Sequence, residues 1–228
     1  MKKYVLIFLL FAQTIFAQST ININRLNWLP ESHSFWVNEH DNIAVYDAKK
    51  LTENKIVLTK DQMKASGFQG KIEKLIWNST KSKVLVYTNS KKVWRGNTKG
   101  NYWYFDLTTG KGYQLGKDLE ASSLMFAKFS NDNANVAYVS KHNIYVENLD
   151  SHTIKQLTKD GTAKIINGTF DWVYEEELAC RDGFRWSPDG NSIAYWRVDA
   201  TDTKFHLMIN NTDSLYSYVV PVEYPKAG

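Results

Sequence analysis

The sequence contains very little cysteine and no recognisable metal-binding spacing. Cys180 is the only cysteine, which excludes a disulfide within the chain and a cysteine-based metal cluster. The five histidines are scattered singly, without H-E-x-x-H or another spacing typical of metal ligands. A Walker loop and a G-x-G-x-x-G run are also absent. We therefore expect neither a metal site nor a cofactor.

A G-x-S-x-G motif is absent as well. That motif holds the nucleophilic serine of α/β-hydrolases on a sharp strand-to-helix turn. No other pattern in the sequence marks a catalytic serine, aspartate and histidine. We expect this chain, by itself, to carry no catalytic residues.

The chain also lacks a strong charge of either sign. It has 28 Lys and Arg against 24 Asp and Glu, a formal net charge of +4. Residues 1–17 contain two lysines and no acid, so the remainder carries 4 − 2 = +2. A charge so close to neutral gives no electrostatic reason to expect binding to nucleic acid or to an anionic membrane.

Only one long apolar run is present, and it lies at the start of the chain. Two lysines precede the apolar residues 4–11, and a cleavage site fits after Ala17. This is the layout of a secretory signal peptide, and the run is short for a membrane span. An uncleaved anchor is the alternative. We expect residues 1–17 to be removed and residues 18–228 to be exported to the periplasm or the medium, without a membrane span.

A repeat of about fifty residues runs through the rest of the sequence. Four segments share an aromatic anchor, a turn and a short apolar run. The anchors are Trp28, Trp77, Phe129 and Trp186, which lie 49, 52 and 57 residues apart. A second strand follows in each unit, beginning at Asn42, Asn101, Asn143 and Lys204. Three to four short antiparallel strands per unit are typical of β-propeller blades.

The sequence therefore predicts an all-β fold with about four propeller blades. A β-sandwich also has many short strands, but it does not explain an anchor that recurs in register. Four blades could close a small ring or form part of a larger one. An open part of a ring would leave strand edges and inter-blade faces exposed.

Three consecutive glutamates follow an aromatic-rich run in "DWVYEEEL", residues 171–178. One interpretation makes Asp171 the N-cap of a short helix that carries solvated glutamates. The other is a binding site, because two carboxylates ~4 Å apart repel by about 4 kcal/mol at an effective dielectric near 20. A cation such as a peptide's free α-amino group would relieve that repulsion. The residues alone leave both interpretations open.

Several stretches resemble the N-terminal β-propeller of dipeptidyl peptidase IV-type serine peptidases, in the prolyl oligopeptidase clan. They are "NGTFDWVYEEEL", "FRWSPDGNSIAYWRVD", "MINNTDSLY" and "YPKAG". The Asp-Trp-Val-Tyr-Glu-Glu-Glu motif is specific to that group, whereas "WSPDG" is shared by many propellers. The resemblance covers essentially all of residues 18–228, loosely up to about Thr80 and tightly after Gly168.

The resemblance implies specific roles for three residues. In the family, two glutamates of the motif bind the substrate's free amine, and by position they are Glu176 and Glu177, with Glu175 structural. A loop arginine of the family approaches the carbonyl of the bound dipeptide. The stretch "VWRGNTKGNYWYFDL" resembles that loop and places the arginine at Arg95. The alternative for Arg95 is an ordinary exposed hairpin arginine.

The resemblance also implies an eight-bladed propeller above an α/β-hydrolase domain that releases X-Pro or X-Ala dipeptides from peptide N-termini. We expect residues 18–228 to be about half of that propeller, with the hydrolase domain absent from this chain. The expected partners are peptide N-termini, the protein's own hydrolase domain and, as often in the family, a second copy. The alternative is a non-catalytic envelope propeller that binds a protein or peptide.

Overall fold

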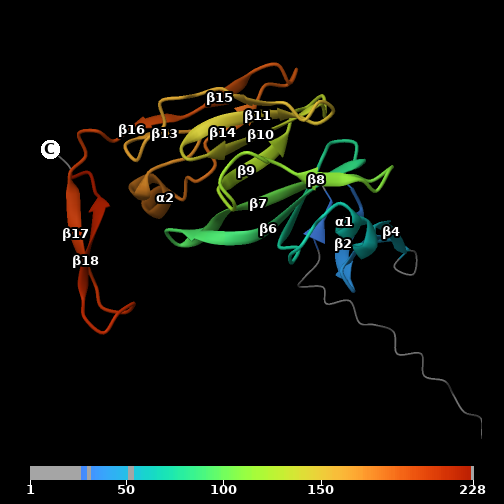
Figure 1. The fold of residues 1–228 in the computed structure, drawn as a ribbon, viewed down its shortest axis with the longest axis horizontal. Coiled ribbons are helices and arrows are strands. Elements are labelled where there is room, and N and C mark those ends of the chain that lie inside the picture. Colours follow the sequence, from blue (N-terminus) through green and yellow to red (C-terminus); the bar gives the residue numbers. More distant parts are fainter. Residues whose placement is uncertain (1–26, 30–31, 51–53, 227–228) are drawn as a thin grey trace, which may run out of the picture.

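The computed structural model describes residues 27–29, 32–50 and 54–226. Within these ranges the protein is built from antiparallel β-sheets and two short helices (Figure 1). The predicted all-β fold is confirmed. The expected signal peptide, residues 1–17, lies outside the described residues.

The first unit is a four-stranded sheet in the order β1-β2-β3-β4. Its strands are β1 (Asn27–Trp28), β2 (Ser34–Glu39), β3 (Asn42–Asp47) and β4 (Asn54–Leu58). His40 and Asp41 join β2 to β3 with φ values of 53° and 70°. Two consecutive positive φ angles define a type I′ turn, whose twist matches that of the flanking strands. Helix α1 (Lys60–Ala65) follows, and a capping box between Thr59 and Gln62 fixes its start.

The second and third units repeat this four-stranded pattern. The second contains β5 (Lys74–Trp77), β6 (Lys83–Val93), β7 (Gly96–Asp106) and β8 (Gly112–Gln114). The third contains β9 (Leu124–Phe129), β10 (Asn135–Ser140), β11 (Asn143–Asn148) and β12 (Ile154–Gln156). A short pairing of β7 with β9, Lys99 with Met125 and Gly100 with Leu124, joins the two units at one end.

The units pack face to face, as propeller blades do. Successive residues of β6 point to opposite faces of its sheet, so they enter two different cores. Val84 and Val86 pack in the cluster shared with the first unit, next to Ile43. Leu85 packs in the cluster shared with the third unit, next to Tyr138. A sheet buried on both faces explains the nearly continuous apolar run of this strand.

All four predicted anchors occupy the same place in their units. Trp28, Trp77, Phe129 and Trp186 are the last residues of β1, β5, β9 and β14, respectively. The predicted "WSPDG" turn is also present, since Gly190 has φ 73° and its N–H donates to the carbonyl of Ser187 at 3.0 Å. The repeat read from the sequence is therefore confirmed at its anchors.

The fourth unit does not form one continuous four-stranded sheet among the described residues. Its elements are β13 (Ile165–Asn167), α2 (Trp172–Leu178), β14 (Phe184–Trp186), β15 (Ile193–Tyr195), β16 (Arg197–Asp199), β17 (Phe205–Asn210) and β18 (Tyr218–Glu223). β13 pairs with β16, β14 with β15, and β17 with β18. The strand expected from Lys204 does form, but it pairs with β18 instead of continuing the blade. Six residues of β17 find partners along β18, which satisfies one edge of each strand.

The β17–β18 hairpin extends away from the other sheets (Figure 1, left). Large apolar side chains along it are exposed: Phe205, Leu207, Met208, Ile209, Leu215, Tyr216, Tyr218 and Val219. Lys164 holds its base, because its Nζ lies 2.9 Å from Glu223 Oε1, donates to the carbonyl of Thr203 at 3.0 Å and lies 4.4 Å from the centre of the Phe205 ring.

Candidate functional site

Helix α2 carries the three consecutive glutamates. Asp171 caps it, since its Oδ1 accepts the backbone N–H of Tyr174 at 3.1 Å. The helix ends at Ala179, which has the left-handed conformation with φ 54°. The helical interpretation of "DWVYEEEL" is thus confirmed. Because consecutive helical residues are rotated by about 100°, three adjacent side chains must point in three directions.

The glutamates have three different environments. The side chains of Glu175 and Glu176 are only 4% and 3% exposed, whereas Glu177 is exposed. Of the two interpretations left open by the sequence, solvation describes only Glu177. Buried carboxylates need a partner, because burying an unpaired charge is costly.

Arg181 is the partner of Glu175. Its Nε lies 3.2 Å from Glu175 Oε1. Burial raises the pKa of the Glu175 carboxyl, and the hydrogen bond and charge of Arg181 lower it again. Arg181 also approaches the hairpin that carries Arg95, since a side chain added at Gly96 would place its Cβ 3.9 Å from the Nε of Arg181. This ion pair closes one side of the site.

The loop that carries Arg181 is itself held in place. Lys128, on β9, forms an ion pair with Asp182 and donates to the carbonyl of Phe184 at 3.2 Å. Its Nζ lies 3.5 Å from the centre of the Phe184 ring. Burial lowers the pKa of Lys128 to about 8, against the opposing effect of Asp182. The third blade thus fixes the loop that follows α2.

Arg95 is the partner of Glu176. It lies at the tip of the β6–β7 hairpin, and its Nε contacts Glu176 Oε2. The arginine side chain is 79% exposed, while both carboxylate oxygens of Glu176 are buried and accept no hydrogen bond from the described residues. The contact is therefore an ion pair without an aligned hydrogen bond. The acceptor capacity of Glu176 is therefore not filled by hydrogen bonds from the described residues.

The hairpin reaches α2 because its strands are unusually long. β6 and β7 have eleven residues each, whereas β10 and β11 of the next blade have six. Two register shifts, between Thr88 and Lys91 and between Lys91 and Lys92, bend the extension. At its base, a Cβ on Gly100 would lie 2.6 Å from the ring of Tyr87. Only glycine allows this close approach.

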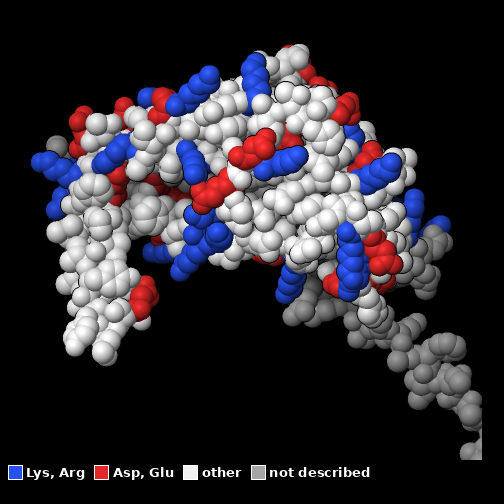
Figure 2. Space-filling model, viewed as in Figure 1, with Lys and Arg blue, Asp and Glu red and all other residues white. Residues whose placement is uncertain are grey.

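A cavity of about 590 Å³ lies beside these ion pairs. Its walls are the β6–β7 hairpin, the turn between β10 and β11, the start of α2 and the base of the β17–β18 hairpin. Phe170, Trp172 and Phe205 give it an aromatic side. Figure 2 shows acidic side chains in the recess between the white β17–β18 hairpin and the body of the molecule, with basic side chains across from them.

The structure brings two of the three predicted site residues into contact. Arg95 and Glu176 form an ion pair, and Glu177 follows on the same helix with no ion pair to a described residue. The sequence analysis missed Arg181, because it lies outside the motif and no local pattern links it to Glu175. It also missed His142, which lines the cavity from a turn of the third blade.

The described residues offer neither a metal-binding cluster nor a membrane-spanning helix. They contain no group of three or more His, Cys, Asp and Glu side chains placed to hold a metal ion. The helices of this part of the chain are too short to cross a membrane.

Successive four-stranded sheets packed face to face define the chain as a piece of a β-propeller. The model of the dipeptidyl peptidase IV (DPP IV) N-terminal region matches residues 78–228, which is more than half of the sequence. The chain belongs to this family.

Individual proteins that are similar to this chain also carry the names of peptidases. Over 190 residues the chain is 33% identical to a probable dipeptidyl-aminopeptidase B of Arthroderma benhamiae, covering 77% of this chain and 21% of that protein. It is 30% identical over 209 residues to the prolyl endopeptidase FAP of Mus musculus, covering 89% of this chain and 26% of that protein. The crystal structure of Porphyromonas gingivalis dipeptidyl peptidase 4 is similar, with 25% identity and a TM-score of 0.73 over 89% of this chain and 29% of that one. The chain thus spans between a fifth and a third of the length of these proteins.

Proposed function

We propose that this chain is the substrate-recognition part of an exported serine-type dipeptidyl peptidase that releases X-Pro and X-Ala dipeptides. In this proposal Glu176 and Glu177 bind the α-amine of the peptide, and Arg95 donates to the carbonyl of the bound dipeptide. The observation that carries it is the state of Glu176, a buried carboxylate next to Arg95 whose oxygens accept no hydrogen bond from the described residues.

A protonated α-amine matches this arrangement chemically. It offers three N–H donors and one positive charge, and the two glutamates offer four acceptor oxygens. Glu176 is shielded from water, which strengthens its attraction for a cation. Glu177 is exposed and follows Glu176 on the helix, and in this proposal it contacts the same amine from the solvent side.

Arg95 can act on the substrate as well as on Glu176. Its Nε faces the glutamate, which leaves the terminal N–H groups of a largely exposed guanidinium for a carbonyl oxygen. Two fixed contacts, one to the amine and one to a carbonyl, hold the peptide at a fixed distance from its N-terminus. The same peptide bond is then always presented for cleavage. Such positioning lowers the barrier for a nucleophile that other parts of the protein supply.

The chemistry is proposed to come from an α/β-hydrolase domain of the full-length protein. The names of the relatives support a peptidase, and this chain spans only 21% of the relative from Arthroderma benhamiae. Export to the periplasm or the medium rests on the N-terminal residues 1–17. A second copy of the protein is proposed to cover the apolar β17–β18 hairpin, whose exposed side chains support an interface.

A non-catalytic envelope propeller that binds peptides is the second candidate. All residues of the proposed amine site belong to this chain, so amine binding does not require a hydrolase domain. Release of dipeptides by the full-length protein separates the two candidates.

The first test compares two glutamate variants of the full-length protein with a matched control. Glu176→Gln and Glu177→Gln keep the shape of each side chain and remove its charge. A charged hydrogen bond contributes about 1.5–3 kcal/mol, so each change should lower kcat/KM for a Gly-Pro chromogenic amide by about 10- to 100-fold. Asp118→Asn removes an exposed carboxylate elsewhere and should leave the rate unchanged. Wild-type rates in both glutamate variants would exclude the proposed amine site.

A further inference from the structure

The carboxylates that line the cavity already have partners. Asp171 accepts the N–H of Tyr174 at 3.1 Å, Glu175 pairs with Arg181 at 3.2 Å, Glu120 pairs with Lys141 at 2.8 Å, and Glu223 pairs with Lys164 at 2.9 Å. Three of these four carboxylates are therefore paired with a cation within the protein, and Asp171 caps α2.

Two lysines that line the same cavity have no carboxylate paired with them among the described residues. Lys91 and Lys99 face each other across β6 and β7 as register partners, and both line the cavity. Neither side chain forms an ion pair or hydrogen bond with a described residue. Like charges directly opposite each other on a sheet are destabilising. The nearby carboxylate of Glu120 has its pKa lowered first by its hydrogen bond with Lys141, and the charges of Lys91 and Lys99 act in the same direction.

His142 supplies a third polar group without a partner. Its Nδ1 is buried, and no described residue hydrogen-bonds it. A buried polar atom of this kind costs free energy until something pairs with it. Burial also lowers the pKa of His142, while Glu223 acts in the opposite direction. A neutral imidazole has one ring nitrogen able to donate and one able to accept.

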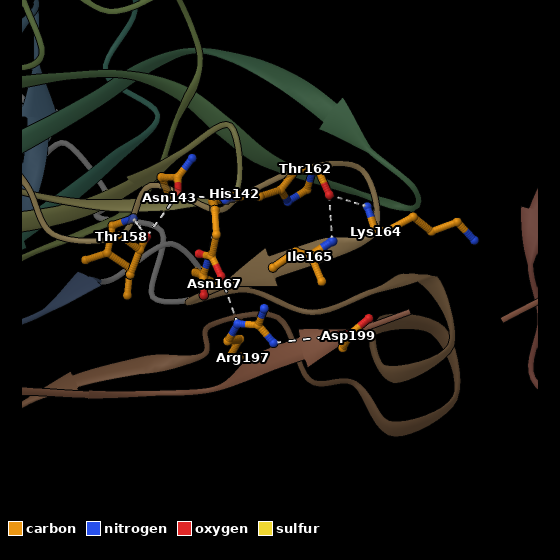
Figure 3. A network of polar contacts seen from close by, with 12 residues as sticks. His142, Asn143, Thr158, Thr162, Lys164, Ile165, Asn167, Arg197 and Asp199 are labelled. Atoms are coloured by element: carbon orange, nitrogen blue, oxygen red, sulfur yellow. Dashed lines mark hydrogen bonds and ion pairs between the residues drawn. The ribbon is translucent and has the colours of Figure 1, made fainter. Parts of the chain in front are cut away.

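A polar network fixes His142 at the cavity wall (Figure 3). Lys141 and His142 form the turn between β10 and β11 with φ values of 46° and 60°. The buried Asn167 donates to the carbonyl of His142 from its backbone and from its Nδ2, each at 3.2 Å. Its Nδ2 also donates to Asp160 at 2.9 Å, and Arg197 pairs with Asp160 at 3.0 Å. The histidine therefore occupies a strained turn position that the blade maintains.

We propose that this cavity binds a carboxylate side chain of the peptide, with Lys91, Lys99 and His142 as its contacts. The inference rests on the proposed amine site and adds to it a preference for acidic peptides. All three groups line the cavity, and no described carboxylate forms an ion pair or hydrogen bond with any of them. The favoured substrates would be peptides with Asp or Glu downstream of the released dipeptide.

The acidic residue of the favoured peptides would lie beyond the released dipeptide, because the amine end of the peptide is held at Glu176 in the proposed function. Test peptides with acids at the fourth and fifth positions satisfy this condition.

The test measures kcat/KM of the full-length protein for two matched peptides. Gly-Pro-Gly-Glu-Glu-Gly carries the acids, and Gly-Pro-Gly-Gln-Gln-Gly carries neutral residues of the same shape. At low ionic strength the acidic peptide should be cleaved about three- to tenfold better, since exposed ion pairs contribute modestly. The preference should shrink as salt is added.

Variants of the lysine pair identify the contact. The double variant Lys91→Gln/Lys99→Gln should abolish the preference for the acidic peptide. Lys92→Gln, which removes a neighbouring charge that does not line the cavity, should keep it. Equal rates for the two peptides in the wild-type protein would overturn the proposal, as would a preference that survives the double variant.

N-acetylated forms of both peptides keep this inference separate from the proposed function. If acetylation abolishes cleavage while acidic and neutral peptides are cleaved equally, only the acidic subsite is wrong. If acetylation has no effect, the amine site itself is wrong.

Discussion

Adjacent residues of identical type have separate roles in this molecule because helix geometry directs them apart. Glu175 points inward to Arg181, Glu176 meets Arg95, and Glu177 faces the solvent. Composition alone could not distinguish them. The family motif predicted which two would bind an amine, whereas the ion pairs depend on contacts between distant segments.

Arg181 is expected to position α2 through Glu175. In Arg181→Met the buried carboxylate loses its charged partner, which costs about 1–3 kcal/mol of unfolding free energy. The double variant Glu175→Gln/Arg181→Met removes both charges and should recover most of that loss. Urea unfolding of the two variants measures both values. A double variant as unstable as the single one would show that the pair does not act as a unit.

Glu147 is expected to make stability depend on pH. Burial raises the pKa of this carboxyl, whose Oε2 accepts the N–H of Gly116 and the hydroxyl of Tyr138, each at 2.9 Å. The folded protein therefore holds this proton more tightly than the unfolded chain, so stability falls as pH rises above the ordinary carboxyl pKa of about 4.5.

Glu147→Gln should remove that part of the pH dependence, because the amide oxygen can accept the same two hydrogen bonds without a charge. The variant should gain stability over the wild type as pH rises from about 4.5 to 7. Urea midpoints across this range provide the measurement, with the exposed Asp202→Asn as control. A stability difference that is independent of pH would contradict the prediction.

At the scale of elements, the β6–β7 hairpin is the feature that creates the site. Its length carries Arg95 from the second blade to the helix of the fourth. The sequence predicted strands in this region and, through resemblance, an arginine loop. It could not predict the two register shifts or the pairing with β9, because these depend on how two blades meet.

Gly100→Ala tests whether the base of this hairpin controls the site. The added Cβ would lie 2.6 Å from Tyr87 Cε2 and 2.8 Å from the carbonyl oxygen of Thr88, so the hairpin must move. Crowding of this kind costs about 1–3 kcal/mol. We expect a lower Tm and, because Arg95 shifts, a higher KM for dipeptide amides. Gly161→Ala, which crowds the carbonyl of His142 instead, is the matched glycine control and should lower Tm without the same rise in KM.

For the whole molecule, the repeat was the most informative part of the sequence. The four aromatic anchors fall at equivalent strand ends, and three units each contain four strands, the second and third being joined in one eight-stranded sheet. The fourth unit was predicted less well, since its last two strands pair with each other and leave the blade. Both strands are apolar and regular, so their sequence fits an outlying hairpin as well as a blade.

The central claim is that this part of the molecule recognises a peptide by its free amine. Isothermal titration calorimetry with the full-length protein tests it most directly, using glycyl-proline and N-acetyl-glycyl-proline, neither of which has a further bond for a dipeptidyl peptidase to cleave. A charged amine between two carboxylates should make the free dipeptide bind at least about tenfold more tightly. Equal affinities for the two dipeptides would contradict the account.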